Sequence, residues 1–175
     1  MFYSTEKLKE TIENHAIYLK DGDTSKRANL RGADLSYTDL SNVNLRGADL
    51  SGAAMCNVDL RGTDLSHADL SDANLTGANM SGVDLSHVDL SDAVLSAANM
   101  SFANLTGANL IDADLSHADL TDADLTGANL SGAQIDYTLL DGTNLLHANL
   151  SGVDLSHVYL IDTDLNCAEG LNGKK

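Results

Sequence analysis

Apolar residues recur at every fifth position of this chain, from Leu30 to Leu165. Of the 28 positions in this series, 24 are Leu, three are Met and one is Ile. Two residues before each of them stands a small residue, which is Ala 17 times, Val six times and Thr five times. A period of five matches neither the 3.6 residues of an α-helix nor the alternation of an ordinary strand. If both kinds of residue point inward, the chain must turn a corner once per pentapeptide.

The residue two places after each apolar position is usually of a type that tolerates a positive φ. Eleven of the 28 are Gly, two are Asn, five are Asp and five are His. A type II turn needs a positive φ at its third residue. Each pentapeptide therefore predicts a short extended piece and a corner, and their repetition predicts a solenoid. Ala97 and Phe102 lack this preference, so we predict a different turn type at these two corners.

The repeated pattern resembles that of the pentapeptide repeat proteins. Two copies that carry the resemblance are Ala48-Asp49-Leu50-Ser51-Gly52 and Ala128-Asn129-Leu130-Ser131-Gly132, and in-frame copies fill residues 28–167 of 175. The resemblance implies an all-β solenoid, a right-handed quadrilateral β-helix of four pentapeptides per coil and about seven coils. The period of five follows from the residues, whereas the twenty-residue coil rests on the resemblance alone.

We expect the chain to have three parts: a lead-in at 1–27, the β-helix at 28–167 and a tail at 168–175. Residues 5–19 predict a helix with Ser4 or Thr5 as its N-cap and Asp21-Gly22-Asp23 at its end. Its apolar stripe is made by Leu8, Ile12, Ala16 and Leu19. We interpret this helix as a cap over the open core of the first coil. The alternative is a helix that binds a partner.

Composition adds a strong negative charge to this picture. The formal net charge is −16, and the chain contains neither Pro nor Trp. Such a surface disfavours direct binding of nucleic acid or anionic membrane and favours cationic partners. The chain has no apolar run of 18 residues and its first residues lack a signal-peptide core, so we expect a cytoplasmic protein.

Acidic residues should stack from coil to coil if each coil holds twenty residues. This acidic ladder is formed by Asp49, Asp69, Asp72, Asp89, Asp92 and Asp112. With coils about 4.8 Å apart, such a ladder could imitate the phosphates of duplex DNA. The alternative is that each Asp only satisfies its own turn.

Several polar positions become apolar late in the repeats, and the C-terminal end has no residues that predict a second capping helix. The predicted interface consists of Tyr137, Leu139, Leu146, Tyr159, Ile161 and Leu171. Exposed apolar clusters commonly mark interfaces, so we predict a homodimer through the C-terminal coils. Drift at unselected positions is the alternative.

Residues with catalytic or metal-binding chemistry give little signal. His67 and His87 fall at corners, where we interpret them as turn residues, and we predict no catalytic site, cofactor or metal. Cys56 predicts a free thiol, Cys167 could pair across a dimer, and Phe102 could anchor a partner.

Two functions remain. The first is a non-enzymatic rigid scaffold or protein-interaction module with an unidentified partner. The second, implied by the resemblance, is a DNA-mimicking modulator of a type II topoisomerase such as DNA gyrase, giving protection against quinolones or toxins.

Overall fold

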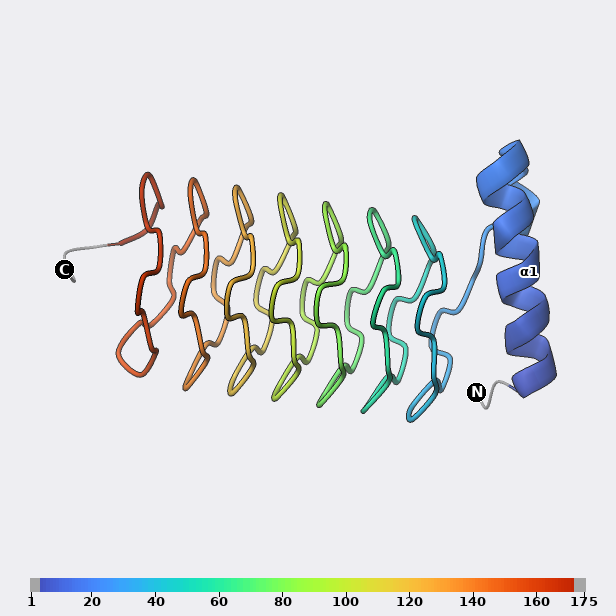
Figure 1. The fold of residues 1–175 in the computed structure, drawn as a ribbon, viewed down its shortest axis with the longest axis horizontal. Coiled ribbons are helices and arrows are strands. Elements are labelled where there is room, and N and C mark those ends of the chain that lie inside the picture. Colours follow the sequence, from blue (N-terminus) through green and yellow to red (C-terminus); the bar gives the residue numbers. More distant parts are fainter. Residues whose placement is uncertain (1–3, 172–175) are drawn as a thin grey trace.

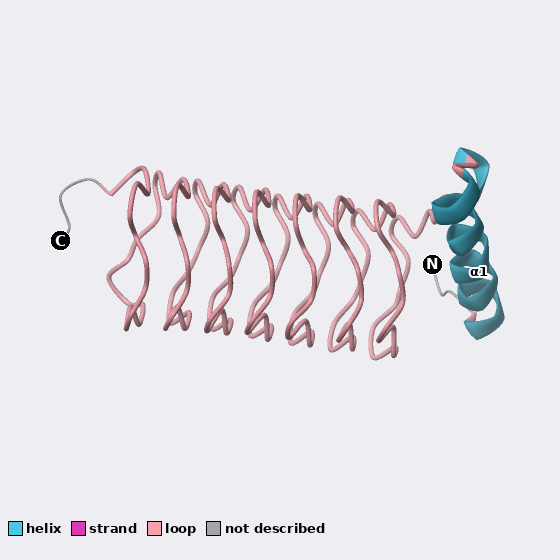
Figure 2. Cartoon of the chain, turned by 45° about the horizontal axis from the view of Figure 1, so that its top comes forward, coloured by secondary structure: helices cyan, strands magenta, loops and turns pink. Residues whose placement is uncertain are grey.

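The chain forms one N-terminal α-helix followed by a rod of stacked coils (Figure 1). The computed structural model describes residues 4–171. The helix α1 lies across one end of the rod, and the coils then follow each other in chain order to the opposite end, where the described residues finish (Figures 1 and 2). Parts of the chain that are adjacent in sequence are therefore adjacent along the rod, as in other repeat architectures.

Helix α1 spans Thr5–Asp21 and is capped at both ends. The Ser4 hydroxyl accepts the backbone N–H of Lys7 at 3.2 Å. At the other end Gly22 adopts a φ of 75°, and its N–H donates to the Tyr18 carbonyl at 2.8 Å. The predicted start is confirmed and the helix runs two residues beyond the predicted end. A short 3-10 helix, η1, spans Thr24–Lys26 and leads into the first coil.

Successive coils pair through parallel bridges between residues twenty apart, from Asn29↔Asp49 to Asn149↔Glu169. Leu30 donates its N–H to the Asp49 carbonyl at 2.7 Å, and Asp49 donates to the Ala28 carbonyl at 3.0 Å. These bridges are isolated, and no longer strand occurs among residues 4–171 (Figure 2). The predicted solenoid and its twenty-residue coil are thus present, built from single bridges. We call residues that differ by twenty a column.

The corners share one backbone conformation. The Leu30 carbonyl accepts the N–H of Ala33 at 3.0 Å, which closes a turn whose third residue, Gly32, has a φ of 60°. The φ of Ala97 is 57° and that of Phe102 is 60°. The different turn type predicted at these two corners is therefore wrong. Backbone bonds to the neighbouring coils hold these corners in the common conformation, although their side chains do not favour it.

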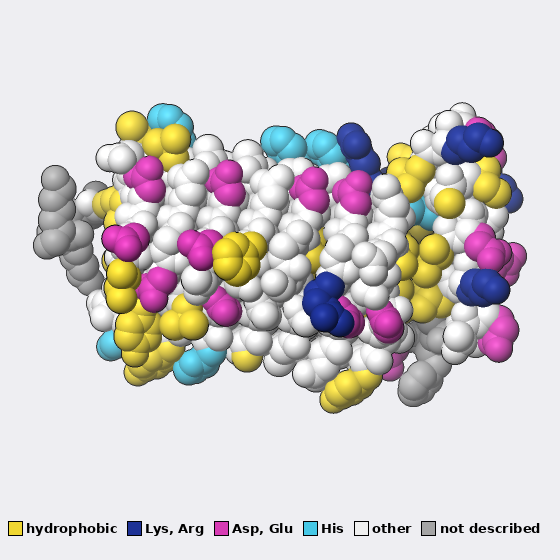
Figure 3. Space-filling model, in the orientation of Figure 1, with side chains coloured by type: hydrophobic (Ala, Val, Ile, Leu, Met, Phe, Trp, Pro, Cys, Tyr) yellow, Lys and Arg dark blue, Asp and Glu magenta, His cyan; other side chains and the backbone are white. Residues whose placement is uncertain are grey.

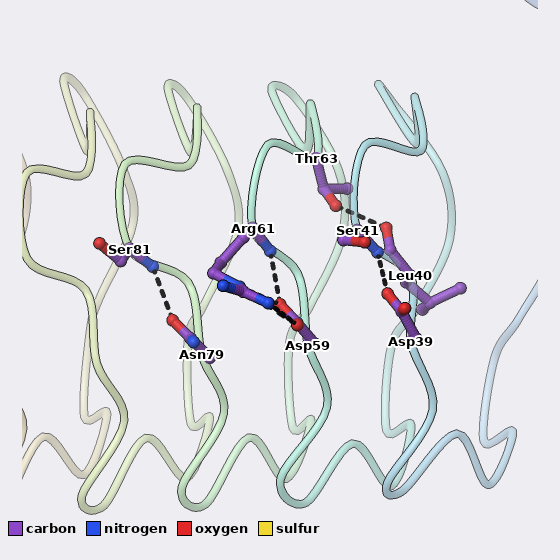
Figure 4. A network of polar contacts seen from close by, with 8 residues as sticks. All are labelled: Asp39, Leu40, Ser41, Asp59, Arg61, Thr63, Asn79 and Ser81. Carbon is purple, nitrogen blue, oxygen red and sulfur yellow. Dashed lines mark hydrogen bonds and ion pairs between the residues drawn. The ribbon is translucent and has the colours of Figure 1, made fainter.

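The Asp or Asn that precedes most apolar positions bridges the following corner. The Asp39 carboxylate accepts the N–H of Ser41 at 2.9 Å, and the Asn79 side-chain carbonyl accepts that of Ser81 at 3.4 Å (Figure 4). Side chains of this kind commonly bond the backbone two residues on. This bond explains why the position is polar even where it lies on a half-buried face.

Leu and Ala side chains fill the interior of the rod, and Leu50 and Ala113 are both 0% exposed. Thr can replace Ala because its hydroxyl finds a backbone acceptor, which lies in the previous coil at four of the five Thr positions. Thr63 donates to the Leu40 carbonyl at 2.7 Å (Figure 4). Further bonds of this kind join Thr138 to Leu115, Thr143 to Leu120 and Thr163 to Leu140. Buried hydroxyls are thereby satisfied, as interiors require.

The last coil leaves the register on one side. His117 donates its N–H to the carbonyl of Asp136, nineteen residues later, but Tyr137 donates to His157, twenty residues later. Among the corners in residues 4–171, His157 alone lacks a positive φ, and the bridge ladder there skips the pair at 134 and 154. Nearby inward side chains are only partly buried: Val153, Leu155 and Val158. The C-terminal coil is therefore closed less tightly than the coils before it.

Candidate interaction surfaces

The acidic ladder contains two kinds of carboxylate. Asp49, Asp69 and Asp89 form one column, joined by two bridges, and all three are half-buried. Each accepts the N–H of the Ser two residues later at 3.1 Å and also the hydroxyl of that Ser. These three carboxylates therefore hold their turns.

Asp72, Asp92 and Asp112 form the next column and lie at exposed corners, with φ of 57°, 57° and 55°. Within residues 4–171, no other residue donates a hydrogen bond to these three carboxylates. The same column holds Gly at other coils, such as Gly52 and Gly132, and Gly satisfies a positive φ without strain. The corner does not require Asp, so these three carboxylates remain available to a partner.

Charge is distributed unevenly along the rod. Residues 62–171 contain 17 Asp and Glu residues and neither Lys nor Arg, whereas residues 1–61 contain nine Asp and Glu and eight Lys and Arg. The N-terminal third is thus nearly neutral, and the following coils are anionic throughout. Residues 62–171 therefore offer no Lys or Arg side chain that could pair with the carboxylates of a second copy.

Arg61, the last cation before this stretch, is engaged by its neighbour Asp59. Its Nη2 lies 2.6 Å from Asp59 Oδ2, and its Nε lies 3.0 Å from Oδ1 (Figure 4). The Arg61 guanidinium lowers the pKa of Asp59 below its usual value. Hydrogen bonds from Ser41 similarly lower the pKa of Asp39. The acidic groups here stay ionised, and the charge of Arg61 is compensated locally.

Exposed apolar side chains gather on the last coils. Tyr137, Leu139, Tyr159 and Ile161 are 52%, 38%, 56% and 64% exposed, and we call these four the C-terminal patch. The bridge Leu139↔Tyr159 places two of them in one column. Figure 3 shows hydrophobic side chains collected at this end of the rod, beside acidic ones. The other two predicted members, Leu146 and Leu171, are half-buried instead.

Three aromatic rings stack along the corner column beside this patch. The ring centroids of His117 and Tyr137 are 5.3 Å apart, and those of Tyr137 and His157 are 5.5 Å apart. His157 Nδ1 also lies 3.4 Å from Asp136 Oδ1. The sequence pattern predicts only turn formers at these His positions, and the twenty-residue spacing of His117, Tyr137 and His157 is the signal that could have indicated the stack. His67 and His87 stack in the same way, at 5.2 Å.

Helix α1 contacts the first coil through a face that differs from the predicted stripe. Leu8 is buried in the core cluster, Ile12 packs against it and Leu19 is half-buried. Ala16, however, is exposed, and its predicted place on the buried face is wrong. His15 takes that place: it is 0% exposed, its Nδ1 accepts the N–H of Ala28 at 3.0 Å, and its ring stacks on Tyr18. An Ala methyl offers no acceptor for that N–H.

Other candidate groups remain isolated from one another. Cys56 is half-buried and Cys167 exposed, and both are free thiols. Phe102 is exposed at its corner. In residues 4–171, no three His, Cys, Asp or Glu side chains come together as a metal site. No helix in this part of the chain has the length and apolar character to cross a membrane.

Comparison with known proteins agrees with the repeat geometry. The profile described as pentapeptide repeats matches eight copies over residues 26–62, 57–92, 89–127 and 128–166. The chain belongs to the pentapeptide repeat family. No curated protein matches.

Solved structures similar to this pentapeptide repeat protein come from several sources. HetL of Nostoc sp. strain PCC 7120, involved in heterocyst differentiation regulation, is 32% identical, over 83% of this chain and 86% of HetL, with a TM-score of 0.44. Rfr23 of Cyanothece 51142 is 29% identical, over 87% of this chain and 97% of Rfr23, with a TM-score of 0.44. The plasmid-mediated fluoroquinolone resistance protein QnrB1 is 21% identical, over 81% of this chain and 77% of QnrB1, with a TM-score of 0.45.

Proposed function

We propose that this chain is a rigid, non-enzymatic scaffold that binds other proteins through its outer columns. The observation that carries this proposal is the bonding of each coil to the next, with the inward positions occupied by apolar side chains. Outward side chains are thereby held about 4.8 Å apart along a column. A surface of fixed spacing and low conformational freedom suits recognition, because little entropy is lost on binding.

A set of corner variants tests this role. The substitutions Asp72→Gly, Asp92→Gly and Asp112→Gly introduce the residue found elsewhere in the same column, so the fold should be kept. Proximity labelling in cells would compare partners of the wild type and of this triple variant. Loss of specific partners supports the proposal. An identical set of neighbours for both proteins would contradict a role for the acidic ladder.

The finer description of the fold belongs to the same proposal: a right-handed quadrilateral solenoid of about seven coils, capped by α1. The burial of Leu8 and His15 and the packing of Ile12 support the cap. An uncovered first coil would expose unpaired backbone, which promotes aggregation. Deleting residues 1–21 should therefore cause aggregation or loss of the first coils, and a stable monomeric product would argue against capping.

A homodimer through the C-terminal coils is supported by the partly buried last coil. Leu160 is 36% exposed, whereas Leu140, one coil earlier, is 2% exposed. Two anionic ends repel each other, and salt screens this repulsion, so association should strengthen between about 0.05 and about 0.5 M salt. Light scattering at several protein concentrations checks this. A monomeric mass across the whole range would exclude the dimer.

Modulation of a type II topoisomerase is a second candidate, supported by the unbroken anionic stretch and the exposed Asp column. Purified protein would be titrated into a gyrase supercoiling assay, with and without a quinolone. Inhibition or rescue that weakens with salt and with the triple Gly variant supports DNA mimicry. The absence of any effect at large excess would reject it for that gyrase.

A cytoplasmic location is also part of the proposal. Both cysteines are free thiols, as a reducing compartment favours. Cell fractionation checks this, and recovery from an oxidising compartment would contradict it.

A further inference from the structure

The C-terminal patch combines aromatic and aliphatic side chains with carboxylates. Leu139 and Tyr159 share one column, and Ile161 follows two residues after Tyr159. The Asp141 carboxylate accepts the N–H of Ile161 at 3.1 Å, which places this carboxylate beside the patch. Asp162 is the corner residue directly after Ile161. The patch is therefore apolar at its centre and acidic at its rim.

The ring surfaces that a partner can reach lie at the end of the aromatic column. Tyr137 is stacked between His117 and His157, so both of its faces are covered. Within residues 4–171, His157 has a ring on one side only, and its side chain is 57% exposed. Tyr159, two residues later, is exposed as well. A planar group could stack on these two rings.

Charge decides what kind of planar group fits. The rim is anionic, and residues 62–171 contain no Lys or Arg. Two copies that meet through this side would bring like charges together, which costs free energy at an interface. A guanidinium is planar, always charged, stacks on aromatic faces and bonds carboxylates with two donors. An ammonium group has the charge without the plane.

We infer that the C-terminal patch binds an arginine-bearing segment of another protein. The guanidinium stacks on Tyr159 and His157, the neighbouring carboxylates accept its N–H groups, and Leu139 and Ile161 cover the apolar part of the segment. This inference rests on the proposed function as an interaction module and names the chemistry of its partner. It concerns the side of the rod, so an end-to-end dimer remains compatible with it.

Fluorescence anisotropy with two labelled peptides tests the inference. One peptide alternates Arg and Ser, and the other has Lys in place of every Arg, at equal length and charge. We expect the Arg peptide to bind the wild-type protein about three- to tenfold more tightly at about 0.15 M salt. In the double variant Tyr159→Asn with Ile161→Ser the two affinities should become equal.

These substitutions are matched to the fold. Asn79 and Asn99 stand in the column of Tyr159, and Ser81 and Ser101 in that of Ile161. The control is Tyr37→Asn. Tyr37 is an exposed corner residue in the same column as Tyr137 and His157, and the next residue of that column, Asn57, is already Asn. This control should keep the full preference for arginine, and circular dichroism would verify that both variants are folded.

Equal affinities of the two peptides for the wild type would overturn the inference, because net charge alone would then explain binding. A preference that survives in the double variant would also overturn it. So would a wild-type dimer that the double variant dissociates, since the patch would then be occupied by a second copy. If partners depend on the Asp corners while no arginine preference exists, the scaffold function stands and only this inference fails.

Discussion

His15 links α1 to the first coil, and replacing it with Leu removes one specific bond. Its Nδ1 accepts the N–H of Ala28 at 3.0 Å inside a fully buried contact. Leu keeps apolar volume but leaves that N–H without an acceptor, which costs about 1–3 kcal/mol. Well above pH 6.5, His15→Leu should therefore reduce the free energy of opening α1 from the coils. The net loss should stay below this amount, because Leu also removes Nε2, which is buried without a hydrogen-bond partner in residues 4–171.

The pH dependence of the same variant gives an independent check. Burial lowers the pKa of His15 below its ordinary value of 6.5. The backbone of Arg46 opposes this shift, and the nearby charge of Arg27 acts in the same direction as burial. Below pH 6.5 the unfolded chain binds a proton that the folded chain does not. Wild-type stability should fall there by up to about 1.4 kcal/mol per pH unit, until the folded pKa is reached. The variant lacks this loss, so the difference in the free energy of opening α1 between the wild type and the variant should become smaller below pH 6.5.

Hydrogen exchange measures this local opening, which a global unfolding curve of a repeat protein would obscure. For the amides of α1 and of Ala28, the exchange rate of the variant would be divided by that of the wild type, above and below pH 6.5. His67→Asn is the control, because it removes an exposed corner His and introduces a residue found at other corners. A ratio near one above pH 6.5, or one that does not change below it, would refute the assigned role of His15.

Three further substitutions probe the coils. Ala97→Gly should raise the free energy of unfolding by about 0.5–1 kcal/mol, because the φ of Ala97 is 57° and the same column holds Gly77. The melting temperature should rise accordingly, and a lower melting temperature would contradict this. Thr143→Val should cost about 0.5–1.5 kcal/mol in urea unfolding by removing the bond to the Leu120 carbonyl, and unchanged stability would show that bond to be unimportant. Ala118→Leu should cost about 1–3 kcal/mol by the same assay, since Ala118 is 0% exposed, and tolerance would imply unfilled space.

The core could be predicted from the sequence because its two inward positions are nearly invariant in type. Leu50 and Ala48 are both fully buried, and so are their counterparts in the coils before and after. The coil length could not be derived in this way, since a five-residue period fits several coil sizes. The bridges between residues twenty apart supply it. Pairing across coils is a tertiary property that local pattern does not contain.

The candidate surfaces were predictable only in part. Columns such as Asp72, Asp92 and Asp112 follow from the coil length alone. The buried His15 did not follow, because helical spacing allows either His15 or Ala16 on the inner face and only the Ala28 N–H decides between them. The shifted register at His157 was not predictable either, since its pentapeptide keeps a regular pattern. Sequence periodicity specifies packing and leaves such local choices to the surroundings.

A chain with a twenty-residue register can lose one pentapeptide without disturbing its interior. Removing residues 73–77, for example, would leave every later Leu facing inward. All later outward residues would turn by one side of the coil, however, so Asp92 would no longer share a column with Asp72. Insertions and deletions of five residues are thus neutral for packing but reassign whole surfaces. In the history of such a protein, changes in length can therefore create or destroy binding faces while the fold stays the same.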